Sequence, residues 1–116
     1  MAEIKESDWK ILQELHLLAL ERYCEEILFE VQRITSGGGK SFHQKYLDIW
    51  AVLHRRDKEL AETFDDLKRS RAFVIIAAMA RLAVLSDHEI MRFSQETRTM
   101  IGALLGNSVG RSPGSQ

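Results

Sequence analysis

Three consecutive glycines followed by Lys40 and Ser41 are the residues that most resemble a chemical motif. A phosphate-binding loop ends in Gly-Lys-Ser, and its backbone N–H groups cradle the phosphates of a nucleotide. Such a loop also requires a glycine five positions before its last glycine, and here that position is Ile34. It should follow a buried strand, whereas this segment follows apolar residues at helical spacing. We therefore predict a loop between two helices, with Ser41 as the N-cap of the second.

Four histidines and one cysteine are the other candidates for metal binding or catalysis. Metal ligands on one helix lie three or four residues apart, and no two histidines have this spacing. His54 and Asp57 do have it, but an ion pair in solvent explains them equally well. We expect His16 to be a packing residue with satisfied hydrogen bonds and Cys24 to be a small buried side chain. The sequence thus predicts no metal, no cofactor and no enzymatic activity, and a helical metalloenzyme is the least favoured hypothesis.

An aromatic and cationic group between residues 42 and 56 is the strongest candidate for a binding surface. Phe42, Tyr46 and Trp50 follow one another at intervals of four, so they share one face of a helix. Aromatic and arginine side chains are enriched at protein interfaces, but a helix also buries an aromatic stripe in its own core. The sequence leaves both readings open. The interface hypothesis assigns partner contact to Tyr46, Trp50, His54, Arg55 and Arg56.

Basic residues form two clusters, at 54–58 and 67–71, and both are interleaved with acidic residues. Nucleic-acid binding by a helix calls for a cleaner basic face, because the phosphate backbone repels carboxylates. A small nucleic-acid-binding helical protein is nevertheless the alternative function. It would use Arg55, Arg56, Arg69 and Arg71.

The composition is that of an ordinary globular protein, since 45% of the residues are hydrophobic and 28% are charged. A formal net charge of -1 gives no general attraction to nucleic acids or acidic membranes. The most apolar run, at 72–80, is much shorter than the about 20 residues that cross a bilayer. The first eight residues are too charged for a secretory signal, and a single cysteine suits a reducing compartment. We expect a cytoplasmic protein without a membrane span.

Few helix-breaking residues interrupt the chain, because the only proline is Pro113 and the only glycines before residue 102 are 37–39. Apolar spacing predicts a helix that begins after an N-cap at Ser7 and ends at about residue 35. It also predicts helix over residues 42–85, as one long helix or as two. In the second region, residues 72–85 are apolar on almost every side and should be buried. A capping box at Ser86 opens a last helix that should end at Gly106.

The predicted fold class is therefore all-α, a small bundle of four to five helices with a long N-terminal helix. Residues 1–105 should form a single helical domain, and residues 106–116 a disordered tail. Helices of such unequal length seldom cover one another within one subunit. A two-fold homodimer would bury the remaining apolar surface, so we expect one.

Two C-terminal segments, FDDLKRSRAFVIIAAMARL (64–82) and VLSDHEIMRF (84–93), resemble the fluorescence recovery proteins of cyanobacteria. They are more similar still to relatives of that family in other bacteria. The shared features are an aromatic residue before two aspartates, a Val-Ile-Ile run and a last helix opened by acidic residues. The resemblance covers about residues 45–101. It implies an all-helical, dimeric protein that is not an enzyme.

The cyanobacterial members of that family bind the photoactivated orange carotenoid protein and hasten its return to the inactive form. They use aromatic, histidine, acidic and arginine side chains of the middle helices. In this chain, residues 46–56 (YLDIWAVLHRR) supply similar residue types in the corresponding region. The resemblance thus implies a homodimeric regulator that binds a client protein, whether orange-carotenoid-protein-like or another. It would act by favouring one conformation of that client.

Overall fold

The computed structural model describes residues 3–109, and within them it contains five α-helices, one 3-10 turn and no strand. The α-helices are α1 (Glu6–Ser36), α2 (Phe42–Phe64), α3 (Ala72–Arg81), α4 (Asp87–Ile90) and α5 (Gln95–Val109). The 3-10 turn, Arg69–Arg71, directly precedes α3. The all-α fold class with a long N-terminal helix is confirmed. None of the helices in this part of the chain is both long and apolar enough to cross a membrane.

Helix α1 begins earlier than its sequence suggested. Its N-cap is Lys5, which makes no side-chain capping bond, so the prediction of Ser7 as N-cap is wrong. Glu6 and Asp8 place negative charge in the first turn, which the helix dipole favours. The helix ends at Ser36, where Gly37 turns the backbone to an extended conformation. At 1.5 Å per residue the helix is about 46 Å long.

Helix α2 starts as predicted, because the Ser41 hydroxyl accepts a hydrogen bond from the Gln44 N–H at 3.0 Å. It ends at Phe64, so of the two alternatives for region 42–85, two helices are confirmed and one long bent helix is wrong. A non-helical segment at 65–68 and the 3-10 turn separate α2 from α3.

Helix α3 is the predicted apolar helix, and it buries Ile75, Ile76 and Met79 almost completely. It is not buried on every side, because Val74 is half exposed. It also ends at Arg81, four residues before the expected limit. The chain reverses there because Ala83 adopts a left-handed conformation with φ of 60°.

The single last helix expected over 86–106 is in fact two helices. Ser86 and Glu89 form the predicted capping box, but α4 ends at Ile90. The Ser94 N–H then donates to the Asp8 carboxylate instead of continuing the helix, and the Ser94 hydroxyl accepts from the Thr97 N–H at 3.4 Å. Helix α5 thus starts at Gln95, and it continues through Gly106 to Val109. The rest of the expected tail, residues 110–116, lies outside the described part of the chain.

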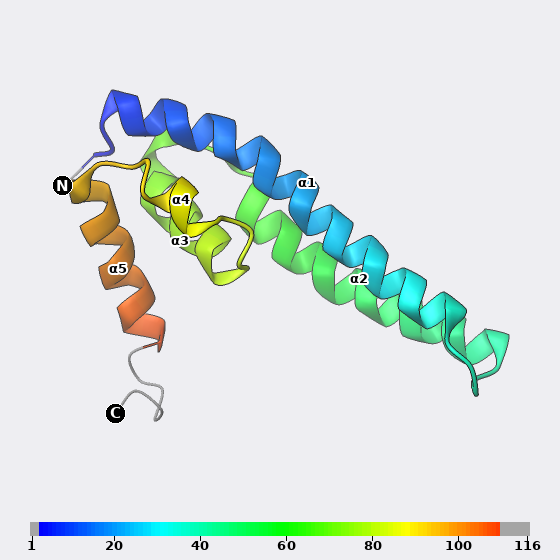
Figure 1. The fold of residues 1–116 in the computed structure, drawn as a ribbon. Helices are drawn as coiled ribbons and strands as arrows, with labels where there is room; N and C mark the ends of the chain where they lie inside the picture. Colours follow the sequence, from blue (N-terminus) through cyan, green and yellow to red (C-terminus); the bar gives the residue numbers. More distant parts are fainter. Residues whose placement is uncertain (1–2, 110–116) are drawn as a thin grey trace.

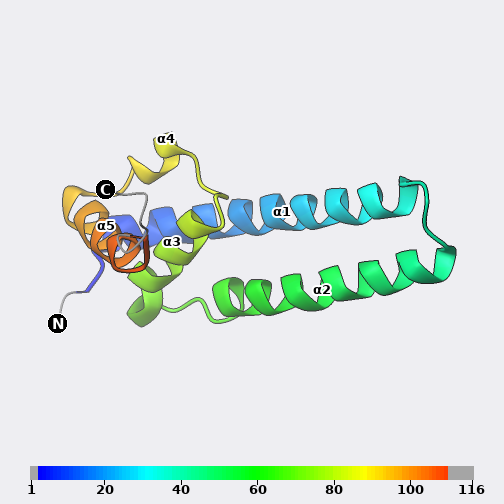
Figure 2. The same cartoon turned by 90° about the horizontal axis from the view of Figure 1, so that it is seen from below.

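The apolar core lies at one end of the molecule. In Figures 1 and 2, α3, α4 and α5 gather beside the N-terminal half of α1 and the C-terminal end of α2. The remainder of α1 and α2 projects from this end as an antiparallel pair, which we call the arm. The buried core cluster comprises Ile4, Leu12, Leu15, Ala19, Tyr23, Ile27, Phe64, Ala72, Ile75, Ile76, Met79, Val84, Leu85, Phe93 and Ile101.

Candidate protein-binding surface

The aromatic residues predicted to share a face of α2 point into solvent rather than into the core. Phe42 is 89% exposed, Tyr46 is 63% exposed and Trp50 is 58% exposed. They lie on the arm, where α3, α4 and α5 do not reach, so the rest of the subunit does not cover them. Of the two readings left open by the sequence, burial in the subunit's own core is therefore wrong. We call Tyr46, Trp50 and His54 the aromatic row.

Within the aromatic row, Trp50 and His54 stack on each other. Their ring centroids are 5.0 Å apart, and the ring planes differ by 8°. Residues four apart on a helix lie one above the other, which is why the two rings can stack. The stack holds a large, half-exposed indole in a defined position on the outside of α2.

The two arginines after the row are turned towards α1. Arg55 donates to Glu30 at 3.2 Å, and Arg56 donates to the other carboxylate oxygen of Glu30 at 3.1 Å. Partial burial would raise the pKa of Glu30, but the hydrogen bonds and charges of these arginines outweigh it and lower that pKa. Arg55 and Arg56 therefore connect α2 to α1 through ion pairs. They do not lie in the same row as Tyr46 and Trp50.

Arg56 also belongs to a polar network that sequence reasoning missed. Its guanidinium lies over the ring of the fully buried Tyr23, 5.4 Å from the centroid. The Tyr23 hydroxyl donates to the Glu59 carboxylate. Burial, together with this bond to a carboxylate, raises the pKa of Tyr23. Tyr23 reads as an ordinary apolar position in the sequence, and no local signal pairs it with residues more than 30 positions away.

A groove of about 500 Å³ runs beside the aromatic row, between α1 and α2. Its walls are mainly apolar, and Arg56 and Asp57 add one charge of each sign. The lining residues are Ile27, Trp50, Leu53, His54, Arg56, Asp57 and Leu60. The spacing of Trp50, Leu53, Asp57 and Leu60, at intervals of three and four, could have revealed this face of α2 from the sequence.

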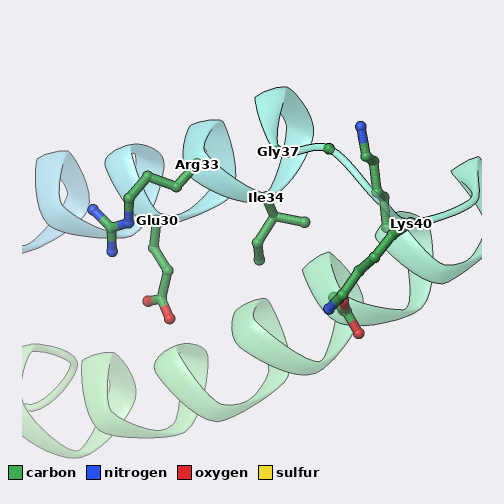
Figure 3. A pocket seen from close by; sticks show the side chains of 8 residues that line it. Glu30, Arg33, Ile34, Gly37 and Lys40 are labelled. Carbon is green, nitrogen blue, oxygen red and sulfur yellow. The ribbon is translucent and has the colours of Figure 1, made fainter.

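A second pocket, of about 350 Å³, lies at the tip of the arm and contains the Gly-Lys segment (Figure 3). Figure 3 shows Glu30 and Ile34 pointing from α1 towards α2. The Lys40 ammonium is paired with Asp48 at 2.6 Å, and Ser41 serves as the N-cap of α2. The residues that could have contacted phosphate are thus engaged in holding the loop, as the sequence predicted for a connection between helices.

The four arginines of the nucleic-acid hypothesis do not form one basic surface. Arg69 is paired with Glu6 at 2.6 Å near the chain's N-terminal end, and Arg71 approaches Asp66. Arg55 and Arg56 share Glu30 on the arm. Each arginine therefore has an acidic neighbour, and the two pairs belong to different parts of the molecule.

Potential metal ligands are dispersed over the described residues. No group of three or more histidine, cysteine, aspartate or glutamate side chains between residues 3 and 109 could hold a metal ion. Cys24 is half-buried rather than buried. His16 is buried against Phe64, with ring centroids 5.2 Å apart, but its Nε2 has no hydrogen-bond partner among the described residues. The prediction that its hydrogen bonds would be satisfied is therefore wrong.

Comparison of the chain with protein-family models, with curated proteins and with solved structures found no match.

Proposed function

We propose that the protein is a non-enzymatic, homodimeric helical regulator that binds a partner protein in the cytoplasm. The contact would be made by the aromatic row on the outside of α2. The observation that carries this proposal is the exposure of Tyr46 and Trp50, whose rings face solvent on a helix that buries its other side.

The aromatic row has the properties of a binding anchor. Tyrosine and tryptophan bury a large apolar area while losing few rotatable bonds, which makes them frequent hot spots. The stack on His54 already restricts the Trp50 ring. Immobilising the Trp50 ring in a complex would therefore cost less conformational entropy than immobilising a freely rotating side chain.

Arg55 and Arg56 are assigned a supporting part in partner contact. Arg56 lines the groove beside Trp50, and Arg55 lies half exposed on the same turn of α2. Their shared bonds to Glu30 fix the guanidinium groups, so N–H donors left over would be presented at a defined place. Acidic side chains of a partner would meet them at the edge of the contact rather than at its centre.

Regulation would follow from differential binding. A partner with two conformations shifts towards the one that this surface binds more tightly, and by no more than the difference in affinity. The resemblance to fluorescence recovery proteins makes the photoactivated orange carotenoid protein the first client to test. Its rate of return to the inactive form can be followed by absorbance.

The test compares variants of the aromatic row with a matched control. The wild-type chain, Trp50→Ala and His54→Ala are used as baits in lysate of the source organism, and any captured protein is purified for affinity measurement. Val74→Ala, a half-exposed apolar residue of α3 outside the row, is the control. We expect Trp50→Ala to weaken binding at least about 30-fold, as loss of a hot spot does, and Val74→Ala to leave it unchanged.

Two results would contradict the proposal. One is a captured protein whose affinity is the same for Trp50→Ala and wild type, because the row would then not be the contact. The other is capture of nucleic acid alone, with binding that falls steeply as salt rises. Failure of the orange carotenoid protein to respond would remove that client only.

A further inference from the structure

The Met91 side chain, which directly follows α4, contacts an arginine of α5. Arg98 Nη1 donates a hydrogen bond to the Met91 Sδ at 3.3 Å. Residues 91–94 connect the two helices, so this bond joins the two sides of the connection. A thioether sulfur is only a weak hydrogen-bond acceptor. A charged donor of α5 is thus paired with a poor acceptor at the end of α4.

The Arg98 guanidinium has few strong partners. It carries five N–H donors in a fixed planar arrangement. Nη2 donates to the Gln95 side-chain oxygen at 3.1 Å. The Nε is buried and has no hydrogen-bond partner among residues 3–109. The side-chain acceptors of this cation are therefore a neutral amide oxygen and a thioether, and a stronger acceptor at the position of the sulfur would bind it more tightly.

The Met91 side chain is open to solvent. It is 63% exposed, whereas Met79 is completely buried in the core and Met100 is half-buried. Met91 is thus the most exposed methionine in the described part of the chain. Oxidation converts methionine to its sulfoxide, and the reaction requires that the oxidant reach the sulfur. A small oxidant in solution would therefore reach Met91 before it reached Met79.

We propose that Met91 is a site of reversible oxidation by a peroxide, and that its sulfoxide binds Arg98 more tightly than the thioether does. A lone pair of the Met91 Sδ attacks one oxygen of hydrogen peroxide, and the S–O bond forms as the O–O bond breaks. The departing hydroxide takes the proton of the transferred oxygen and leaves as water. The sulfur gives up two electrons, and the peroxide accepts them. This site is independent of the proposed partner binding through α2.

The sulfoxide would supply the acceptor that Arg98 lacks. Its oxygen is polar, and methionine has three rotatable bonds through which this oxygen can turn towards Nη1. A hydrogen bond from a guanidinium to a strongly polar oxygen is charge-assisted, and it is stronger than one to a neutral, weak acceptor. Oxidation of Met91 should therefore strengthen the connection between α4 and α5.

The usual damage from methionine oxidation should be small at this position. A sulfoxide disrupts a core because it places a polar group among apolar side chains. Met91 lies mainly in solvent, so little apolar contact is lost. The neighbouring helices are already bound to α1, since Glu89 pairs with Arg22 and Ser94 bonds to Asp8. A stronger bond to Arg98 would add to these contacts, and the exposed sulfoxide would remain accessible to methionine sulfoxide reductases, which reverse the reaction.

The test measures the unfolding temperature (Tm) before and after treatment with hydrogen peroxide. Peptide mass spectrometry locates the oxidised residues, and the peroxide is removed before unfolding. We expect Met91 sulfoxide to form at least about 10-fold faster than Met79 sulfoxide. The Tm of the wild-type chain should rise by about 2–4 °C, and methionine sulfoxide reductases should return it to the starting value.

Three variants separate Met91 from other groups that peroxide can oxidise, such as Cys24. Met91→Leu keeps an apolar side chain of similar volume but cannot be oxidised, and Arg98→Leu removes the donor. Both should lose the rise in Tm. Met100→Leu is the matched control, because it removes a half-buried methionine of α5 and should keep the rise.

Four results would overturn the proposal. Met91 may be oxidised no faster than Met79, or the Tm of the wild-type chain may fall once Met91 is oxidised. A rise that persists in Met91→Leu would belong to another oxidised group, and one that persists in Arg98→Leu would not depend on the guanidinium. The reductase step uses the wild-type chain alone, so this part of the test does not depend on the folding of any variant.

Discussion

The carboxylate of Asp8, in the first turn of α1, accepts two hydrogen bonds from Ser94, the residue that precedes α5. The Ser94 N–H donates to Oδ1 at 3.0 Å, and the Ser94 hydroxyl donates to Oδ2 at 2.6 Å. The Thr97 hydroxyl adds a third bond, also at 2.6 Å. Asp8 is only 2% exposed. One buried carboxylate thus fixes the start of α5 against the start of α1, 86 residues away in the sequence.

Replacing Asp8 with alanine should destabilise the protein strongly. The substitution leaves one N–H and two hydroxyl groups without their acceptor, and buried groups of this kind cost about 1–3 kcal/mol each when unpaired. We expect the free energy of unfolding in urea to fall by at least about 2 kcal/mol. Glu25→Ala, an exposed acid on the same helix, should change it by less than about 0.5 kcal/mol. Equal effects of the two substitutions would mean that the Asp8 bonds do not hold α5 in place.

Glu89 should make stability sensitive to acid. Its two hydrogen bonds from Arg22, at 2.6 and 2.8 Å, outweigh its burial and lower its pKa to about 2. The unfolded chain has a glutamate pKa of about 4.3, so this contribution is complete above that pH and is lost as pH falls towards 2. Glu89→Gln should therefore be less stable than wild type by roughly 1–2 kcal/mol at pH 6, allowing for solvent screening of the partly exposed Arg22. The difference should shrink to roughly a quarter of that value by pH 2.5, just above the folded-state pKa of about 2, and urea unfolding at both pH values measures it.

His16 should make stability fall in the same direction, with decreasing pH, but over a higher pH range. Burial lowers its pKa, because the protonated ring would be desolvated beside Phe64. Below a pH of about 6.5 the unfolded chain binds a proton that the folded chain does not, so wild-type stability falls as pH drops from 7.5 to 5.5. His16→Leu should lack this loss and should be at least as stable as wild type at pH 5.5. A variant with the same pH slope as wild type would show that another group causes it.

The local features of the fold could be predicted from sequence, and the non-local ones could not. Ser41 and Ser86 cap α2 and α4 as expected, because an N-cap bond joins residues only three apart. The division between α4 and α5 depends on Asp8, which no local pattern associates with Ser94. The left-handed conformation of Ala83 could not be predicted either, because alanine is the residue that most favours continuing a helix.

The spacing of the aromatic row was enough to place it on one face of a helix. The spacing did not predict whether that face is exposed or buried. Exposure depends on where α3, α4 and α5 pack, and they pack at the other end of α1. Arg56 was expected to face a partner because the sequence does not show which helix packs against its side of α2. Its bonds to Glu30 and Tyr23 join residues 26 and 33 positions apart, which only the antiparallel packing of α1 and α2 brings together.

Ala83 offers a way to stabilise the protein. The N–H groups of Ala83 and Val84 bond to the carbonyl oxygens of Ala80 and Met79, at 3.0 and 3.3 Å, which is the Schellman pattern that closes a helix. The pattern requires a left-handed residue, and Ala83 supplies it with φ of 60°, where glycine is normally found. A β-carbon in this conformation costs about 1–2 kcal/mol, while glycine adds entropy to the unfolded chain.

Removing the strain of the β-carbon gains more than the added entropy of the unfolded chain costs. Ala83→Gly should therefore raise the free energy of unfolding by about 0.5–1 kcal/mol. Ala51→Gly is the matched control, since Ala51 is an exposed residue within α2 and its replacement should lower stability by about 1 kcal/mol. Urea denaturation of the two variants at one protein concentration gives changes of opposite sign if the chain reverses at Ala83 as described. A loss of stability in both variants would mean that α3 continues through residue 83 in solution, as its apolar sequence alone suggests.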